Sequence, residues 1–462
     1  MLTSPRELFD DLSFTELLSQ NRPYSSGILA NIRAKFINEF NELAQGNLLD
    51  ALTVAEKYID HLPLERHCLL EIHRWLLHEV GHSTLADRVM DKYVDMTLLI
   101  SNQGKALFGI PPIFENLHHL ERIGEMVDQT SNAILASRLG LLDGKPILLV
   151  PDRGRKKLAN TAFFPYLADA FDVVTDDAEV DHLANMIPFI PYDGRILKLN
   201  EHKYGFTYTL LIVLNRLIKS AGLTPNALEL KHETVDKAKE FLKAYEFNDR
   251  NPFVVLHLRE QGISETDSNQ YRNVSPDDYL FAIQWLLNQG ITVVRIGHPK
   301  MTRLPEMTNF IDLSAVPKPG EVDIFLCAKA LFFYGSPSGP MSFAWYFGTP
   351  VLHSNVPNYT LAPQNTLNQL QPMYLLHSSK ILTLRQLSGT HFNKIIHPDA
   401  YKNQGVFLKK CTPDDHLDSV KEMLSFIEKS EICDMNHRAN DKKAAAGIGQ
   451  DIYFTSSSLE FL

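Results

Sequence analysis

A short loop of small residues, Ser336 to Pro340, separates an apolar run from a predicted helix. In a strand-loop-helix unit, the first N–H groups of the helix lack intrahelical partners and point out of the sheet edge. Together with the hydroxyls of Ser336 and Ser338 and the helix dipole, they favour an anion such as phosphate, and Gly339 lets a ligand approach the main chain. Any doubly wound sheet needs such a turn, so the loop indicates an anion site only in company with other residues.

Two arginines add positive charge near the same predicted edge. Arg259 follows the apolar run 253–258, and Arg272 precedes the predicted helix 276–288. A guanidinium group suits phosphate because it can donate two parallel hydrogen bonds. The alternative for Arg259 is an ion pair with Glu260 or Asp312, since a buried arginine seldom lacks a partner. The alternative for Arg272 is simple surface exposure.

Three side chains are candidates for a general base that deprotonates a hydroxyl group: Glu260, Asp152 and His257. The structural alternative for Glu260 is an ion pair with Arg259. His257 lies within a predicted strand, where it could be a core histidine with satisfied hydrogen bonds. Asp152 follows the predicted strand 146–150, where an aspartate is often a turn or cap residue. The sequence does not single out one of the three.

Two further segments follow predicted strands. Gly297 and His298 come after the run 291–296 and suggest a turn that faces a base or a ribose, although His298 could equally be a capping or surface residue. The basic loop 153–157 follows Asp152 and would face a ligand crevice at a sheet edge, or could be a solvated charge run.

The C-terminal half carries the clearest alternation of predicted strands and helices. Ser275 and Pro276 give the helix 276–288 an N-cap and a first residue. Apolar runs alternating with helices predict a doubly wound parallel sheet. The predicted strands are 253–259, 291–297, 310–313, 331–334 and 351–353, and the predicted helices are 276–288, 322–330, 341–348 and 416–428.

The preceding segments divide into two further regions. Residues 106–248 show a less regular α/β pattern, with strands at 146–150 and 171–174 around a helix at 159–170. Residues 1–105 are predicted to be helical, with a repeat close to the tetratricopeptide length. Two copies are too few for a free solenoid, so this region is either a cap on its neighbour or a docking surface for a protein partner. Residues 249–430 form the C-terminal domain and 431–462 a tail, whose last ten residues are predicted to dock back.

Composition excludes several classes of protein. A length of 462 residues with 44% hydrophobic residues predicts a globular chain of about three domains. The net charge of −10 gives no reason to expect nucleic-acid binding. The 4 cysteines are scattered and the 18 histidines lack ligand spacing, so neither a disulfide framework nor a metal site is expected. Without a signal peptide or an apolar run of about 18 residues, the chain is predicted to be cytoplasmic.

The segment from Phe332 to His353 resembles the C-terminal nucleotide-binding segment of GT-B glycosyltransferases of the bacterial heptosyltransferase type. In these proteins a Ser-Gly-Pro loop precedes a helix and a Gly-Thr-Pro-Val strand, as at 338–340 and 348–351 here. The match covers roughly residues 249–360, and it is shared by bacterial glycosyltransferase-like proteins that carry tetratricopeptide helices. Pro337 and Ser342 stand where the heptosyltransferases have an Asp and a His.

The resemblance implies an α/β fold with a GT-B-like pair of Rossmann-type domains, preceded by the all-α tetratricopeptide-like region. It implies transfer of a sugar from a nucleotide-sugar donor to a glycan, lipid-linked or protein acceptor, with inversion and without a metal or cofactor. The site would include Arg259, Arg272 and the loop 336–340. The resemblance is also compatible with a protein that acts at the inner face of the membrane. Two alternatives stay open: a non-catalytic scaffold with a degenerate GT-B domain, and a nucleotide-sugar epimerase.

Overall fold

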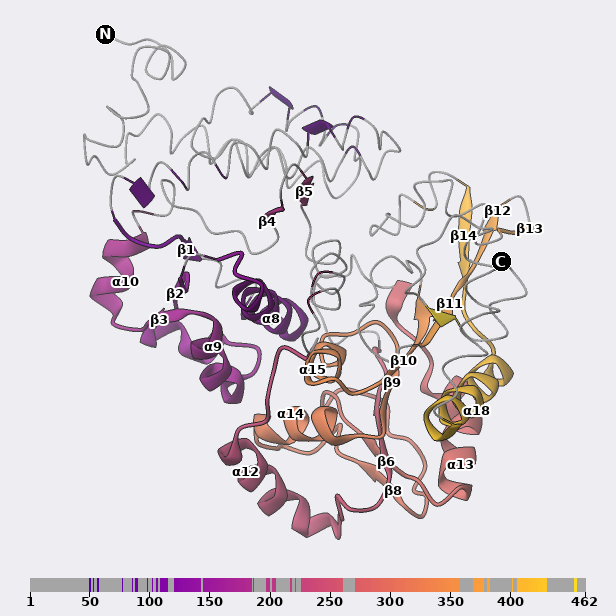
Figure 1. Ribbon diagram of the computed structural model, residues 1–462. Helices are drawn as coiled ribbons and strands as arrows, with labels where there is room; N and C mark the ends of the chain where they lie inside the picture. The colour runs from indigo at the N-terminus through magenta and orange to yellow at the C-terminus, as the bar shows by residue number, and fades with distance from the viewer. Residues whose placement is uncertain are drawn as a thin grey trace. The chain divides into compact units, whose positions relative to one another are not determined.

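The protein is described by a computed structural model (Figure 1), in which two compact units are distinguished. Unit 1 comprises residues 1–117, 143–155 and 171–206, and unit 2 comprises 118–142, 156–170 and 207–462. Each unit is treated by itself. The structure describes residues 109–114, 120–142, 144–184, 197–199, 202–204, 226–260, 271–356, 369–377, 380–382, 405–429 and 453–454, together with single residues scattered outside these ranges. The predicted tetratricopeptide-like region falls almost wholly outside them.

Unit 2 is built on a parallel sheet of 7 strands in the order β15-β11-β10-β9-β6-β7-β8. The chain enters at the centre, winds outward on one side, then returns to the centre and winds outward on the other. This order is that of the dinucleotide-binding α/β folds. The strands are β6 (Phe253–His257), β7 (Thr292–Arg295), β8 (Phe310–Asp312), β9 (Phe332–Gly335), β10 (Val351–Val356), β11 (Gln369–Pro372) and β15 (Tyr453–Phe454).

The central strands are buried along their whole length. Every residue of β6, β9 and β10 is buried. This is why β6 and β9 appear in the sequence as nearly continuous apolar runs and not as alternating patterns, whereas β10 also buries the polar residues His353, Ser354 and Asn355. The predicted doubly wound sheet is therefore confirmed in unit 2. The pairing of β15 with β11 also confirms, for residues 453 and 454, that the tail docks back.

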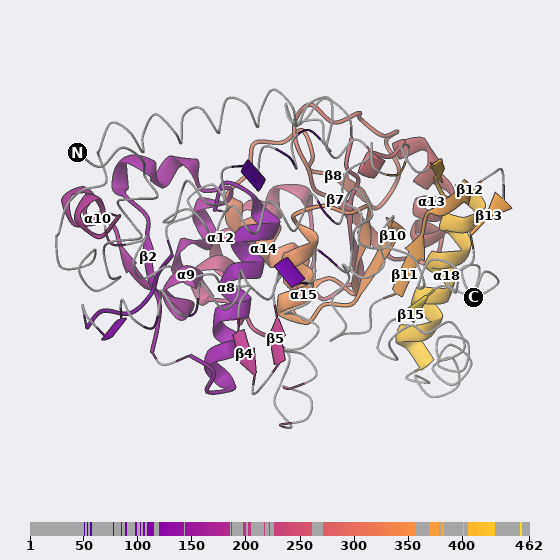
Figure 2. The ribbon, with the colours of Figure 1, turned by 90° about the horizontal axis from the view of Figure 1, so that it is seen from above.

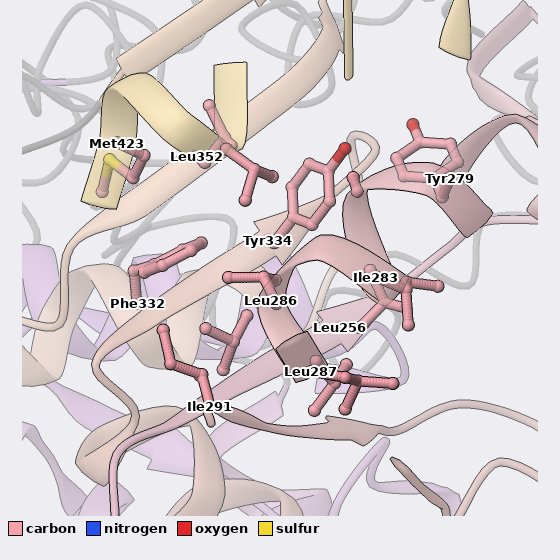
Figure 3. Packing of buried hydrophobic residues seen from close by; sticks show 14 of the residues in the cluster. Leu256, Tyr279, Ile283, Leu286, Leu287, Ile291, Phe332, Tyr334, Leu352 and Met423 are labelled. Carbon is pink, nitrogen blue, oxygen red and sulfur yellow. The ribbon is translucent and has the colours of Figure 1, made fainter. Parts of the chain in front are cut away.

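Helices cover both faces of this sheet. Figures 1 and 2 show α13 (Leu280–Asn288) and α18 (Pro413–Lys429) on one face, and α12 (His232–Leu242), α14 (Gly320–Lys329) and α15 (Met341–Phe347) on the other. On the first face, side chains such as Leu256, Tyr334 and Leu352 pack with Leu286 and Met423 from the two helices (Figure 3). The predicted helix 276–288 begins as a 3-10 turn, η5 (Pro276–Tyr279), and Ser275 caps it without a side-chain hydrogen bond.

Segments from before residue 171 also belong to unit 2. Helix α8 (Ile123–Arg138) packs on α15, and α9 (Phe164–Ala170) packs on α8. The short turn η2 (Thr161–Phe163) contributes Phe163, whose ring lies 5.6 Å from that of Phe343. The side chain of Asn160 caps η2 and donates to the Gly320 carbonyl at 3.0 Å, which fixes the start of α14.

Unit 1 contains a second, smaller parallel sheet in the order β1-β2-β3. Its strands are β1 (Ile113–Phe114), β2 (Ile147–Leu149) and β3 (Asp172–Val174), which confirms the predicted strands near 146–150 and 171–174. A 3-10 turn η1 (Asp152–Lys157) follows β2, and α10 (Asp177–Ala184) follows β3. Strands β4 (Leu197–Leu199) and β5 (His202–Tyr204) form an antiparallel pair. The domain boundaries at 105, 248 and 430 stay predictions.

A third sheet, antiparallel and of 3 strands, lies in unit 2 in the order β13-β12-β14. Its strands are β12 (Tyr374–His377), β13 (Lys380–Ile381) and β14 (Val406–Lys409). Within the described ranges, no helix is both long and apolar enough to cross a membrane.

Candidate functional site

The carboxyl ends of β6 and β9 meet where the winding of the large sheet reverses. Ligands of open α/β sheets bind at such a switch point. Arg259 follows β6 and the loop 336–340 follows β9, so the fold brings together two groups that the sequence predicted to bind an anion. The Arg259 N–H donates to Ser336 Oγ at 2.9 Å. Ser336 is fully buried. Its hydroxyl group therefore links the residues that follow β6 and β9 through a hydrogen bond shielded from water.

The start of α15 is closely packed. The N–H groups of Ser342 and Phe343 donate to the carbonyls of Gly339 and Pro340 at 3.0 and 3.1 Å, so these two donors are already used within the turn. A Cβ on Gly339 would lie 2.9 Å from the Gly124 nitrogen at the start of α8, which is too close for any other residue. Ser338 Oγ is buried and has no hydrogen-bond partner within the described ranges. Of the loop's side chains, Ser338 is thus the one with an unused hydroxyl.

Gly335 ends β9 opposite His257 of β6. A Cβ on Gly335 would collide with the His257 carbonyl oxygen, which belongs to the main chain and cannot rotate away. We therefore expect Gly335→Ala to lower the free energy of unfolding by about 1–3 kcal/mol, as overpacking does, and to shift the urea midpoint downward. Arg250→Ala is the control, because Arg250 is exposed before the other end of β6. Equal midpoints for the two variants would contradict the expectation.

The two predicted phosphate ligands have different surroundings. Arg259 is partly exposed, and its Nε donates to Asn273 Oδ1 at 3.2 Å. The guanidinium of Arg272 lies 5.9 Å from the ring centroid of Tyr271, and its Nε is buried without a hydrogen-bond partner among the described residues. Both arginines are held near the sheet edge, and Arg272 retains an unused donor.

Glu260 is part of a buried ion-pair network that the sequence did not reveal. Arg295, which is fully buried at the end of β7, donates to Glu260 Oε1 at 2.6 Å and to Asp312 Oδ2 at 3.0 Å. The Thr302 N–H donates to Glu260 Oε2 at 2.8 Å. Both carboxylate oxygens are engaged, so the geometry favours a structural role for Glu260. Glu260 and Asp312 are the two carboxylates that the sequence suggested as partners of Arg259, and both pair with Arg295 instead.

His257 is a core histidine at the end of β6, 7% exposed. Burial, followed by the charges of Arg295, Arg259 and Lys318, lowers its pKa to about 3. The imidazole is therefore neutral at physiological pH. Lys318, in the loop between β8 and α14, pairs with Asp323 at 3.5 Å and was not among the predicted site residues.

The turn after β7 is a surface feature. His298 is exposed, and its Nδ1 accepts from the Lys300 N–H at 3.2 Å. The His298 N–H approaches Met301 Sδ at 3.3 Å, and the same side chain packs against Gly297. This arrangement favours the capping alternative for His298.

Asp152 lies in unit 1, at the first position of η1. Its side chain is exposed, and its N–H donates to the Thr175 carbonyl at 3.0 Å. The neighbouring Arg153 forms ion pairs with Asp181 and Asp177 of α10. These contacts favour the alternatives in which Asp152 is a turn residue and the basic loop is a solvated charge run.

Two carboxylates on α8 were missed by sequence reasoning. Glu125 stands in the first turn of α8, beside Gly124, and pairs with Arg122 at 3.0 Å. Asp128, one turn further, is 4% exposed. Burial raises the pKa of Asp128 to about 7, with a further rise from Glu125, while hydrogen bonds from Ser342 and Tyr346 oppose it. The contact between Gly124 and Gly339 places both carboxylates on a helix that starts beside the predicted anion loop.

The described residues contain no group of three or more His, Cys, Asp or Glu side chains that could hold a metal ion. No protein-family model and no curated protein matches the chain.

Several solved structures have a similar backbone. ADP-heptose lps heptosyltransferase II of E. coli is 11% identical with a TM-score of 0.41, and the alignment covers 69% of this chain and 100% of that one. A glycosyltransferase family 9 protein from Veillonella parvula is also 11% identical with a TM-score of 0.41, covering 68% and 96%. The iron-containing dodecameric glycosyltransferase TibC of enterotoxigenic E. coli is 14% identical with a TM-score of 0.37, covering 69% and 77%.

Proposed function

We propose that the protein is a glycosyltransferase that moves a sugar from a nucleotide-sugar donor to an acceptor hydroxyl group, with inversion and without a metal ion. The observation that carries the proposal is the switch point of the large sheet, where Arg259 and the loop 336–340 adjoin. A donor diphosphate needs positive charge and N–H or O–H donors, and these residues offer both. Arg272, with its unused Nε, adds a second cation.

In the proposed reaction, the acceptor oxygen attacks the anomeric carbon while the bond from that carbon to the diphosphate oxygen breaks. The diphosphate leaves with the bonding electrons, and Arg259 and Arg272 stabilise its charge. A general base takes the acceptor proton. We assign this role to Glu125 in preference to Glu260. Glu260 is buried and both its oxygens are engaged by Arg295 and Thr302, whereas Glu125, although paired with Arg122, is partly exposed at the start of α8 and can meet an acceptor.

The remaining predicted ligands have supporting roles in this proposal. Ser338 would donate its hydroxyl to the diphosphate, and Gly339 and Pro340 would shape the turn. His257, neutral at the end of β6, would offer a hydrogen bond and no charge. The acceptor is a glycan, a lipid-linked molecule or a protein, and the site of action is the cytoplasm or the inner membrane face.

Arg259→Ala is expected to weaken binding of the cognate nucleoside diphosphate by about tenfold to a hundredfold, since a hydrogen bond to a charged group contributes about 1.5–3 kcal/mol. Calorimetry with the diphosphate selected by a thermal-shift screen of uridine, guanosine, adenosine and cytidine diphosphates provides the measurement. Arg250→Ala is the matched control, because Arg250 is exposed at the opposite end of β6. Unchanged affinity in Arg259→Ala would remove the phosphate assignment.

Product analysis separates the proposal from its alternatives. A transferase consumes the donor only when an acceptor is present, apart from slow hydrolysis, whereas an epimerase converts the donor alone. Failure to bind any nucleotide would leave the scaffold interpretation.

Glu125→Gln should abolish transfer while leaving diphosphate affinity intact, because the proposed base acts on the acceptor and not on the leaving group.

A further inference from the structure

A chain of buried hydrogen bonds lies at the carboxyl end of β10, and the proposed transfer does not use it. Strand β10 buries three consecutive polar residues, His353, Ser354 and Asn355. Buried polar groups cost free energy unless they are hydrogen-bonded, so an apolar strand end would be the simpler solution. Ser354 Oγ donates to the Gly335 carbonyl at 3.1 Å and lies 2.8 Å from the hydroxyl of Tyr279, the last residue of η5. Asn355 Nδ2 donates to the same Tyr279 hydroxyl at 3.1 Å.

The chemistry of the donors fixes the direction of every bond in this chain. The Cys411 N–H donates to Asn355 Oδ1 at 2.8 Å, which orients the amide so that its NH₂ group faces Tyr279. Ser354 has one hydroxyl hydrogen, which is directed to the Gly335 carbonyl, so Tyr279 donates to Ser354. Burial raises the pKa of Tyr279 above its ordinary value, so its hydroxyl keeps the proton that it donates. The bonds therefore run from Asn355 through Tyr279 and Ser354 to Gly335, and these four residues are here called the relay.

The backbone of Asn355 departs from regular strand geometry where it joins the relay. Asn355 has a φ of 54°, in the left-handed region, and the register of β10 against β11 shifts between Ser354 and Val356. A bulge of this kind turns a side chain in a new direction, and bulges are frequent next to active sites. The left-handed conformation costs free energy that the surroundings must offset. Asn355 is therefore held in an unfavourable conformation in which its amide reaches Tyr279.

At one end, the relay reaches the predicted anion loop. Gly335 is the last residue of β9 and immediately precedes Ser336, whose hydroxyl accepts from the Arg259 N–H at 2.9 Å. Ser354 therefore holds the strand end from which the loop 336–340 starts.

At the other end, the relay reaches the segment that carries Arg272. Tyr279 ends η5, which follows the residues 271–275 in the chain. In that segment Asn273 Oδ1 accepts from Arg259 Nε at 3.2 Å, and the Val274 N–H donates to the Arg259 carbonyl at 2.8 Å. Two links thus join the Arg272 segment to the anion loop, one through Arg259 and one through the relay. Together with the main chain from 274 to 279 they close a ring around the proposed diphosphate ligands.

We propose that Tyr279 is a positioning residue of the diphosphate site: through Ser354 it sets the place of Arg272 relative to the loop 336–340. This inference rests on the proposed function, since the ligand that both groups would hold is the diphosphate of the donor. A site already held in its binding geometry loses less conformational entropy when the ligand binds. The relay is shielded from water, where successive hydrogen bonds polarise and strengthen one another. Tyr279 and Ser354 act through Gly335 and η5 and are not proposed to contact the ligand.

Calorimetry of Tyr279→Phe with the nucleoside diphosphate selected by the thermal-shift screen tests the proposal. Phenylalanine keeps the ring and removes the hydroxyl, so Asn355 Nδ2 loses its acceptor and Ser354 Oγ loses its donor. The dissociation constant should rise by about tenfold, since misplacing an interacting group by about 1 Å can cost as much as about a hundredfold. Ser354→Ala should give a similar rise, and the double variant should lose no more than either single variant, because each change breaks the same relay.

Tyr334→Phe is the matched control. The ring of Tyr334 lies 5.4 Å from that of Tyr279 in the same buried cluster (Figure 3). Its hydroxyl is also buried but has no hydrogen-bond partner within the described ranges. Removing it breaks no bond of the relay, so Tyr334→Phe should bind the diphosphate like the wild type. Circular dichroism at the temperature of the calorimetry shows whether each variant is folded.

A double-mutant cycle separates positioning from stability, because loss of a buried hydrogen bond lowers stability whatever its role. In the Arg272→Ala background, Tyr279→Phe should change the dissociation constant by less than about twofold, since the group that Tyr279 positions is gone. An equal rise in both backgrounds would overturn the proposal, and so would an equal loss in Tyr334→Phe. A wild type that binds no nucleoside diphosphate would overturn the proposed function together with this inference. Wild-type binding with unchanged affinity in Tyr279→Phe would overturn this inference alone.

Discussion

Arg295→Leu should lower the free energy of unfolding of unit 2 by about 3–5 kcal/mol, the usual cost of removing one partner from a buried ion pair. The side chain of Arg295 is fully buried, and its two carboxylate partners are 8% and 21% exposed. Leucine would leave Glu260 and Asp312 facing each other without a cation, and the Thr302 carbonyl, which Arg295 reaches at 2.6 Å, without a donor. A urea titration followed by tryptophan fluorescence would show the midpoint shift, since Trp285 and Trp345 both belong to unit 2.

A compensating variant separates charge from packing. Arg295→Leu combined with Glu260→Leu and Asp312→Asn removes all three charges and should recover most of the lost stability, because replacing a buried ionic group by apolar residues is often neutral. A loss below about 1 kcal/mol in Arg295→Leu alone would mean that water reaches the carboxylates and that the network contributes little.

The same network bears on the assignment of the general base. If Glu260 is structural, Glu260→Gln should lower stability by a measurable amount and leave the pH dependence of transfer unchanged. A base would behave in the opposite way, with activity lost and stability kept. The prediction therefore tests the preference for Glu125 as well as the network itself.

The large sheet could be predicted from the sequence because its strands are buried on both faces. Runs such as 253–256 and 331–334 are continuously apolar, and helix-forming segments separate them, which leaves few alternatives to a doubly wound sheet. From the sequence, Arg295 is only one residue of the predicted strand 291–297. Its partners lie 35 and 17 residues away in sequence, so no local pattern could have identified them. A lone arginine in an apolar strand was the available signal.

The candidate site was predictable in part for the same reason. The loop 336–340 follows from small residues between a strand and a helix, and its place at the switch point follows from the sheet order. The engaged hydroxyl of Ser336 and the collision at Gly335 depend on strand register, which apolar runs do not encode. Glu125 and Asp128 were missed because their importance comes from the packing of α8 on α15, a tertiary contact. The polar run 128–132 in a buried helix was the signal that could have drawn attention to them.

Asp128→Asn should stabilise unit 2 at alkaline pH and leave its stability unchanged in acid. The pKa of Asp128 is about 7 in the folded state, compared with about 3.9 for an unfolded chain. Below both values the carboxyl is protonated in both states, so its ionisation contributes nothing. As the pH rises from about 4 to about 7, the unfolded chain releases a proton that the folded chain retains, and the wild type loses up to about 4 kcal/mol of stability. Asparagine keeps the size and cannot ionise, so this loss should disappear.

Urea midpoints of wild type and Asp128→Asn between pH 4 and pH 8 would test this expectation, with Asp236→Asn as the control because Asp236 is exposed on α12 of the same unit. The control should follow the wild type at every pH. Suppose instead that the urea midpoint of Asp128→Asn changed with pH in parallel with that of the wild type. In that case the Asp128 carboxyl of the wild type would be ionised in the folded state, and a cation or water would have to reach its Oδ1. If the expected curve is found, the chain retains at the α8-α15 contact a carboxyl group that costs stability near neutral pH. Such a cost is typical of functional sites and is consistent with a role beside Glu125 in the proposed proton transfer.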